Sequence, residues 1–200
     1  MQSLSRRFFI QTIIGLSLAS NKVLAAVATG GTNLSDGAEI LRLSANGWVP
    51  NNPRLPVLLY RNVLKGTQAG STTRVENLFG STGWPPQWVA GIYDFHHYHS
   101  TAHEVLGVAA GHARVMLGGP NGHIVELHAG DVALLPVGTG HCCLSASDDF
   151  TVVGAYPPNA HWDICRAAPS RSALDRMAAM ANPRHDPVYG DTGPLLRYWG

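Results

Sequence analysis

The sequence predicts an all-β fold, a single small antiparallel barrel with one or two short peripheral helices. The first observation is composition: 45% of the 200 residues are hydrophobic and only 14% are charged, which is typical of one globular domain. The second is that 22 glycines and 13 prolines separate many short apolar segments, as in barrels and sandwiches. The third is a set of 10 histidines, which points to a metal-binding protein.

Residues 1–28 are expected to be an export signal that does not belong to the fold. The basic pair Arg6-Arg7 precedes a moderately apolar stretch at residues 8–19, and Ala-rich sequence follows near residues 26–28. The apolar stretch is shorter than the roughly 20 residues that a membrane-spanning helix needs. We therefore expect a cleaved signal and no stable membrane insertion after processing.

The segment Ser5-Arg6-Arg7-Phe8-Phe9-Ile10-Gln11 is similar to the twin-arginine export motif, in which paired arginines precede apolar residues. That resemblance implies transport of a folded protein to the periplasm or another extracytoplasmic space. Metal could then be inserted in the cytoplasm, before export. Residues 29–200 are expected to form one domain.

Two β-strands are expected at residues 38–43 and 56–63, where apolar, β-favouring residues lie between Asn-, Gly- and Pro-rich turns. After Trp88 the chain alternates short apolar runs with turn residues, which predicts an antiparallel barrel with its core at about residues 88–160. The strands expected there are about 92–99, 104–109, 112–117, 123–127, 131–135, 140–146 and 150–156.

Two short helices are expected, at residues 72–79 and 172–181, because apolar residues recur there every three or four positions. The apolar stripes are Val75, Leu78 and Phe79 in the first helix, and Leu174, Met177 and Met180 in the second. We interpret the two methionines as core contacts rather than as metal ligands. The tail, residues 186–199, is expected to lie along the barrel surface.

His97-Tyr98-His99 is the strongest chemical signal in the chain. Residues two apart on a strand share a face, so His97 and His99 can direct two imidazoles into one space while Tyr98 points away. Glu104 follows after a short turn and can add a carboxylate oxygen, and closure of the barrel would return His141 to the same place. Three nitrogens and one carboxylate suit a divalent transition metal ion: Mn, Fe, Ni, Co or Zn.

These residues fall into two motifs that resemble those of the cupin superfamily. The first cupin motif, G-x5-H-x-H-x3,4-E-x6-G, is matched by Gly91, His97, His99, Glu104 and Gly111. The second, G-x5-P-x-G-x2-H-x3-N, is matched by Gly130, Pro136, Gly138 and His141, with Ser145 in place of Asn. The resemblance covers residues 91–145 and implies a jelly-roll barrel, also called a double-stranded β-helix, with a metal on His97, His99, Glu104 and His141.

Residues 97–104 and 153–158 are also similar to a small, uncharacterised, single-domain subgroup described as YjlB-like. That subgroup implies a metal site and supplies no substrate.

Several neighbours of the motif residues have expected places of their own. His103 is expected to be either a substitute ligand or a residue that orients a carboxylate, whereas His96 and Tyr98 should face outward. Cys143 and Ser145 share the parity of His141 and are expected to line the pocket. The mouth would be framed by Trp84, Trp88, Tyr93 and Phe95.

Two function classes remain open. The first is a metal-dependent enzyme that acts on a small organic molecule, with dioxygenase as the favoured subtype and Glu104 as the group that detaches and moves a proton. The second is a non-catalytic cupin of the cell envelope that binds a metal or a small ligand, and a structural cupin with an empty site is a third possibility. A formal net charge of +1 disfavours nucleic acid as a partner, and exposed strand edges favour a homodimer.

Overall fold

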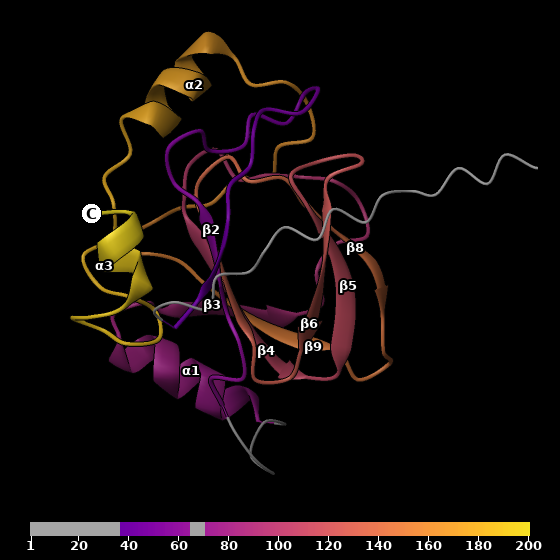
Figure 1. Ribbon diagram of the computed structural model, residues 1–200, viewed down its shortest axis with the longest axis vertical. Helices are drawn as coiled ribbons and strands as arrows, with labels where there is room; N and C mark the ends of the chain where they lie inside the picture. The colour runs from indigo at the N-terminus through magenta and orange to yellow at the C-terminus, as the bar shows by residue number, and fades with distance from the viewer. Residues whose placement is uncertain (1–36, 65–70) are drawn as a thin grey trace, which may run out of the picture. The chain divides into compact units, whose positions relative to one another are not determined.

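The computed structural model describes residues 37–64 and 71–200 (Figure 1). The expected export signal at residues 1–28 lies outside these ranges. No helix within them is long and apolar enough to span a membrane.

Within the described ranges, nine strands form two antiparallel sheets, so the predicted all-β barrel fold is confirmed (Figure 1). The larger sheet has the strand order β1-β2-β7-β4-β9-β3, and the smaller has the order β6-β5-β8. The strands are β1 Glu39–Leu41, β2 Val57–Tyr60, β3 Pro86–Ala90, β4 Glu104–Ala110, β5 His112–Leu117, β6 His123–His128, β7 Val132–Leu135, β8 His141–Ala146 and β9 Thr151–Ala155.

The central strands of the larger sheet are buried on both faces, which explains why β2 and β7 are continuously apolar. One face packs against the inward side of the smaller sheet, where β5 alternates exposed with buried residues as a half-buried strand should. The other face packs against the first helix and the end of the chain. The residues of the two motifs therefore belong to a barrel whose central strands are covered on one face by the smaller sheet and on the other by α1 and the end of the chain.

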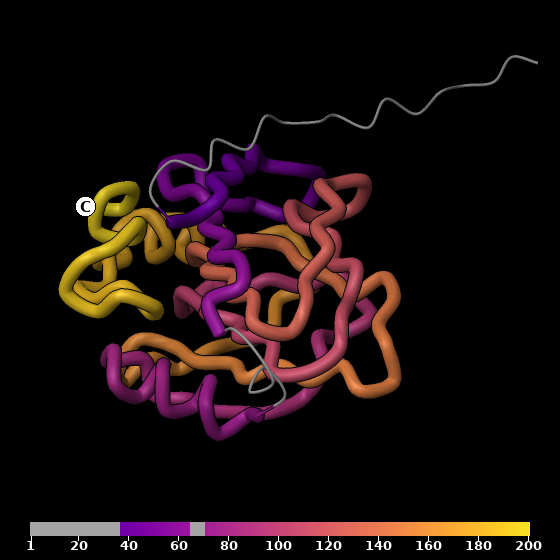
Figure 2. Tube along the Cα trace, turned by 60° about the horizontal axis from the view of Figure 1, so that its bottom comes forward, coloured from indigo at the N-terminus to yellow at the C-terminus, as the bar shows by residue number. Residues whose placement is uncertain are grey.

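Three short helices accompany the sheets, one more than expected: α1 Thr72–Ser81, α2 Arg171–Ala178 and α3 Pro194–Tyr198. Helix α1 runs along one side of the larger sheet, where it contacts β3, β4 and β9 (Figure 2). Its buried residues are Val75 and Phe79. A Cβ atom on Gly107 of β4 would lie 2.4 Å from a methyl carbon of Val75, so glycine is required for this close approach. In α2, Met177 is buried in a small cluster with Tyr98 and Val137, which confirms it as a core contact.

The prediction of a strand at residues 92–99 is wrong. The strand lies earlier, at Pro86–Ala90, where it forms an edge of the larger sheet and pairs with β9. Pro86 is tolerated as the first residue of this edge strand because no ladder partner needs its missing N–H. Residues 91–99 instead follow an irregular path with isolated bridges between His97 and His141 and between Tyr98 and Cys165.

The tail also departs from the expectation that it lies on the surface. Asp186, Leu195 and Trp199 are buried. The Trp199 indole nitrogen donates a hydrogen bond to the backbone oxygen of Pro56 at 2.9 Å, and the Tyr60 hydroxyl donates to the carboxylate of Asp186 at 2.7 Å. The end of the chain therefore completes the core against the larger sheet.

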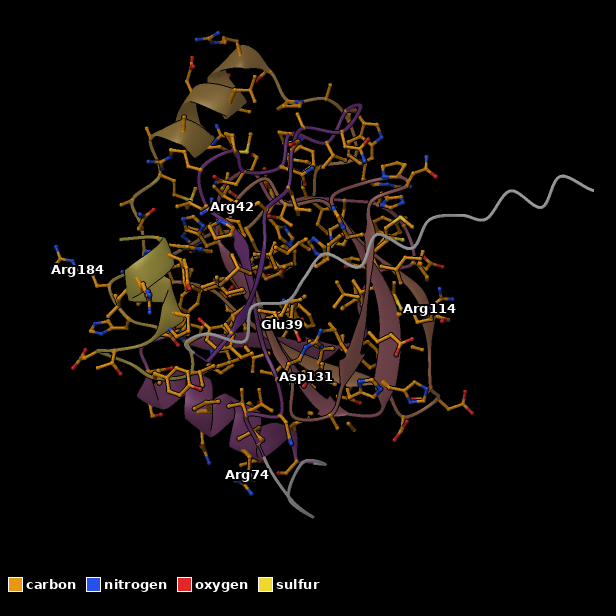
Figure 3. All side chains as sticks on the ribbon, in the orientation of Figure 1. Glu39, Arg42, Arg74, Arg114, Asp131 and Arg184 are labelled. Atoms are coloured by element: carbon orange, nitrogen blue, oxygen red, sulfur yellow. The ribbon has the colours of Figure 1, made fainter. Side chains whose placement is uncertain are left out.

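Three charged side chains connect strands of the larger sheet just beyond the end of β2. Glu39 and Asp131, both labelled in Figure 3, lie on either side of Arg61, at 3.0 and 2.9 Å from its guanidinium nitrogens. Asp131 also accepts a hydrogen bond from the backbone N–H of Asn62 at 2.8 Å. This network links β1, the end of β2 and the start of β7, and it is partly exposed, so we expect it to contribute modestly to stability.

Candidate metal centre

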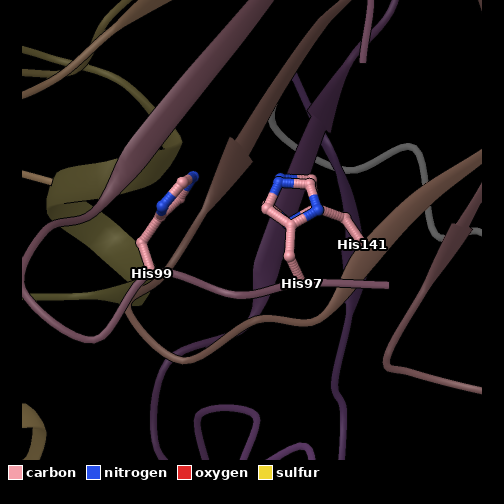
Figure 4. A group of neighbouring side chains, drawn as sticks. All are labelled: His97, His99 and His141. Atoms are coloured by element: carbon pink, nitrogen blue, oxygen red, sulfur yellow. The ribbon is translucent and has the colours of Figure 1, made fainter. Parts of the chain in front are cut away.

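Three histidines meet at one point in the barrel. The ligand-capable nitrogens of His97, His99 and His141 all lie within 4.8 Å of one another, and the three side chains are buried (Figure 4). His97 and His141 exchange two backbone hydrogen bonds, of 3.1 and 2.9 Å, which bring distant parts of the chain together. The side chains of His97 and His99 point to the same place, as predicted from their spacing, although only isolated bridges and no regular strand form there.

Each imidazole is oriented by a backbone carbonyl behind it. The Nδ1–H groups of His97 and His141 donate to the carbonyl oxygens of Phe95 and Thr139, both at 3.1 Å. The Nδ1–H group of His99 donates to the carbonyl oxygen of Asp163. A carbonyl can only accept, so each ring carries its proton on Nδ1 and leaves the lone pair of Nε2 available. Such outer hydrogen bonds are typical of metal-binding histidines.

Glu104 brings a carboxylate to two of the three rings. Its Oε2 atom lies 3.2 Å from Nε2 of His99 and 3.3 Å from Nε2 of His141. This oxygen is buried and has no hydrogen-bond donor. Two lone pairs and a carboxylate oxygen facing one another in a buried space need a cation or a proton between them. A divalent ion therefore fits the donor set and would satisfy the orphaned oxygen.

The pKa values show the same demand for positive charge. Burial, with help from neighbouring His141, lowers the pKa of His97 to about 3 and keeps that ring neutral. Burial also lowers the pKa of His99, but the adjacent Glu104 carboxylate outweighs it and raises the value to about 9. Burial disfavours the Glu104 carboxylate, yet His99 and His141 hold its pKa well below the ordinary value. The site favours an anionic carboxylate beside a positive charge: the proton on Nε2 of His99 supplies it when no metal is bound, and a metal ion would take the place of that proton.

A cavity of about 170 Å³ opens over these four side chains. Besides His97, His99, Glu104 and His141, its lining consists of Trp88, Ala90, Gly91, Ile92, Tyr93, Leu106, Tyr156 and Trp162. The wall away from the histidines is thus mainly aromatic and aliphatic. The site combines a possible metal centre with an apolar chamber.

Tyr156 is the most informative residue that sequence reasoning left without a role. Its hydroxyl donates to Oε1 of Glu104 at 2.5 Å and accepts from the indole nitrogen of Trp88 at 2.9 Å. Burial, followed by the negative charge of Glu104, raises the pKa of Tyr156 and keeps it a donor. These two hydrogen bonds hold the Oε1 atom of Glu104 on the side of Tyr156, while its Oε2 atom faces His99 and His141.

Asp163 and Trp162 are further residues that no sequence motif indicated. The Asp163 carboxylate accepts hydrogen bonds from the backbone N–H and the hydroxyl of Ser100, both at 2.6 Å, which fixes the chain next to His99. Trp162 stacks on Tyr156 with an angle of 13° between the rings. Both lie in irregular chain after β9, where residue type carries no periodic signal.

Other expected site residues lie elsewhere. His103 is buried away from the cavity, and its Nδ1 accepts a hydrogen bond from the backbone N–H of Val137 at 3.0 Å, so the prediction of a substitute ligand was wrong.

Tyr98 was expected to face outward but is buried. Trp84 lies in the core, and neither Cys143 nor Ser145 lines the cavity. Trp88 and Tyr93 line the cavity as predicted. Phe95 does not line it and instead stacks on Tyr93.

Removing the Tyr156 hydroxyl should weaken metal binding without unfolding the protein. In Tyr156→Phe the Glu104 carboxylate loses its fixed orientation, so we expect the metal dissociation constant to rise about tenfold or more. Competition with a chromophoric chelator would measure it. Tyr189→Phe, at an exposed tyrosine of the tail, is the matched control and should leave affinity unchanged. Equal affinity of Tyr156→Phe and the native protein would show that Glu104 needs no such support.

Two comparisons with known proteins bear on the family of this chain. The family model described as Cupin matches residues 95–175. The uncharacterized protein YjlB of Bacillus subtilis (strain 168) is 36% identical over 156 residues, which cover 77% of this chain and 92% of that protein.

Solved structures resemble the chain more distantly. Acireductone dioxygenase from Bacillus anthracis, with a cadmium ion in its active centre, is 16% identical with a TM-score of 0.39, over 55% of this chain and 83% of that one. Procruciferin, an 11S globulin from Brassica napus, is 16% identical with a TM-score of 0.33, over 68% of this chain and 35% of that one. Neither likeness assigns a metal or a substrate here. The family match and the YjlB relative, which spans most of both chains, place this protein in the cupin superfamily.

Proposed function

We propose that this cupin binds one divalent transition metal ion through Nε2 of His97, His99 and His141 and Oε2 of Glu104. The observation that carries the proposal is the buried Oε2 atom of Glu104, which has no hydrogen-bond donor and lies 3.2 and 3.3 Å from two Nε2 atoms. Manganese, iron, nickel, cobalt and zinc all accept three imidazoles and one carboxylate.

We further propose that the protein is an enzyme acting on a small organic molecule, with dioxygenation as the favoured reaction. An ion held by these four side chains would supply Lewis-acid chemistry to a bound substrate. The chain itself supplies the rest: the apolar wall excludes water, and the carbonyls behind the rings hold the histidines in place. Glu104 is the proposed proton carrier, because its carboxylate is the acidic side chain of the cavity lining.

The alternative is a non-catalytic protein that captures a metal or a small ligand. The two are separated by incubating iron-loaded and manganese-loaded protein with a panel of small neutral and acidic compounds while oxygen uptake and products are recorded. Oxygen uptake that disappears in His97→Ala/His99→Ala supports the enzyme. Tight binding of a compound with no turnover by any metal form contradicts it and favours the binding protein.

We also propose that the protein is exported by the twin-arginine route, on the strength of Arg6-Arg7 and the apolar stretch that follows. Replacing both arginines by lysine in the full chain should retain the protein in the cytoplasm. Unchanged recovery of the variant from the periplasmic fraction would contradict twin-arginine export.

A further inference from the structure

The cavity over the proposed metal centre has two chemically different sides. One side holds the three imidazoles and the Glu104 carboxylate. The other is formed by Trp88, Ile92, Tyr93, Leu106, Tyr156 and Trp162. Any ligand that fills the cavity must therefore present polar atoms to the first side and an apolar body to the second.

The polar groups of the aromatic side are largely occupied already. The Trp88 indole donates to the Tyr156 hydroxyl, and this hydroxyl donates to Glu104, so neither is free for a ligand. The indole nitrogen of Trp162 donates to the side-chain oxygen of Gln87 at 3.1 Å. A polar ligand atom placed against Trp88, Tyr156 or Trp162 would lose its water without finding a free N–H or O–H donor there, which costs free energy.

Charge is also absent from the aromatic side. Among the described residues, no lysine, arginine or second carboxylate belongs to the lining. Arg166, whose guanidinium lies 4.2 Å from the centre of the Phe95 ring, is exposed and does not belong to the lining. A free carboxylate or phosphate deep in the cavity would therefore find no counter-ion except the metal itself.

The volume of the cavity limits the size of the ligand that it can enclose. The cavity volume of about 170 Å³ is close to that of an engineered apolar cavity of roughly 150 Å³ that binds benzene. It is well below the 300 Å³ or more of sites for drug-sized molecules. Trp162 and Tyr93 stand edge-on to His99 and His97, at 5.6 and 5.2 Å between ring centres, so aromatic surface begins directly beside the metal-binding rings.

We propose that the cavity binds a neutral molecule the size of a single aromatic ring, which reaches the metal through one or two adjacent oxygen atoms. Its apolar body packs against Trp88, Tyr93 and Trp162. This inference rests on the proposed metal site and adds the chemical class of its ligand.

The test uses the full chain loaded with zinc, which is redox-inert, and titrates it anaerobically with catechol in a calorimeter. Zinc content is measured first, so a failure of the metal site is seen separately from a failure of the ligand class. We expect catechol to bind the zinc form and not the metal-free form. Trp162→Ala should weaken binding about tenfold or more while zinc content stays the same. Ile164→Ala, an exposed residue of the same segment, should have no effect.

A charged analogue gives the decisive comparison. We expect 3,4-dihydroxybenzoate, which adds a carboxylate to the same ring, to bind about tenfold or more weakly than catechol. Equal or tighter binding of the acid would overturn the neutral-ligand inference, as would an unchanged catechol affinity in Trp162→Ala. Absence of catechol binding to protein that does hold zinc would overturn it as well.

Discussion

Asp186→Ala is expected to lower the free energy of unfolding by about 3 to 5 kcal/mol. The Asp186 side chain is fully buried, and its carboxylate accepts four hydrogen bonds. One comes from the Tyr60 hydroxyl at 2.7 Å, and three come from the backbone N–H groups of Val188, Tyr189 and Leu195 at 2.8, 3.0 and 2.9 Å. Its loss would leave four donors without their acceptor, two of them the buried Tyr60 hydroxyl and Leu195 N–H, and would release the tail from β2.

Urea unfolding of the metal-free protein measures this effect. Asp191→Ala is the matched control, because Asp191 lies in the same tail, pairs with His185 and is exposed. It should change stability by less than about 0.5 kcal/mol. If Asp186→Ala also unfolds within about 1 kcal/mol of the native protein, the buried carboxylate does not hold the tail.

Adding zinc or manganese to the metal-free protein should raise its stability by about 4 kcal/mol when the free metal is 1,000 times its dissociation constant. The gain is large because His141 lies far along the chain from His97, His99 and Glu104, so the four proposed ligands meet only in the folded barrel. An ion that binds the folded state and not the unfolded chain stabilises by mass action. Thermal unfolding at a series of metal concentrations measures the gain.

The His97→Ala/His99→Ala variant provides the control for that gain. It keeps Glu104 and His141 but loses two of three nitrogens, so its stability should respond little to added metal. His112 on β5 and His128 on β6 are exposed, and their rings stack on each other. The variant His112→Ala/His128→Ala should therefore respond to metal as the native protein does. Equal stabilisation of all three proteins would place metal binding elsewhere.

Much of the barrel followed from local sequence signals. The strands at residues 104–110, 112–117 and 141–146 begin and end within a residue or so of their expected bounds, because Gly-rich turns separate apolar runs. Helix α1 was also expected, since Val75 and Phe79 lie on one face. Periodicity in sequence indicates burial on one face, which β5 and α1 have.

The errors arose where tertiary contacts override local pattern. Residues 92–99 look like a strand, but backbone pairing of His97 with His141 and of Tyr98 with Cys165 defines their path instead. The burial of Asp186 depends on donors from β2 and the tail, which no local pattern encodes. The spacing of His97, His99 and Glu104 predicted their meeting, whereas Tyr156 and Asp163 could be placed only once β9 and the following segment were packed.

Elemental analysis of the purified full chain tests the central claim most directly. The account predicts about one divalent transition metal ion per chain in the native protein, and loss of that ion in His97→Ala/His99→Ala. Native protein without stoichiometric metal, or a double variant with unchanged metal content, would contradict it.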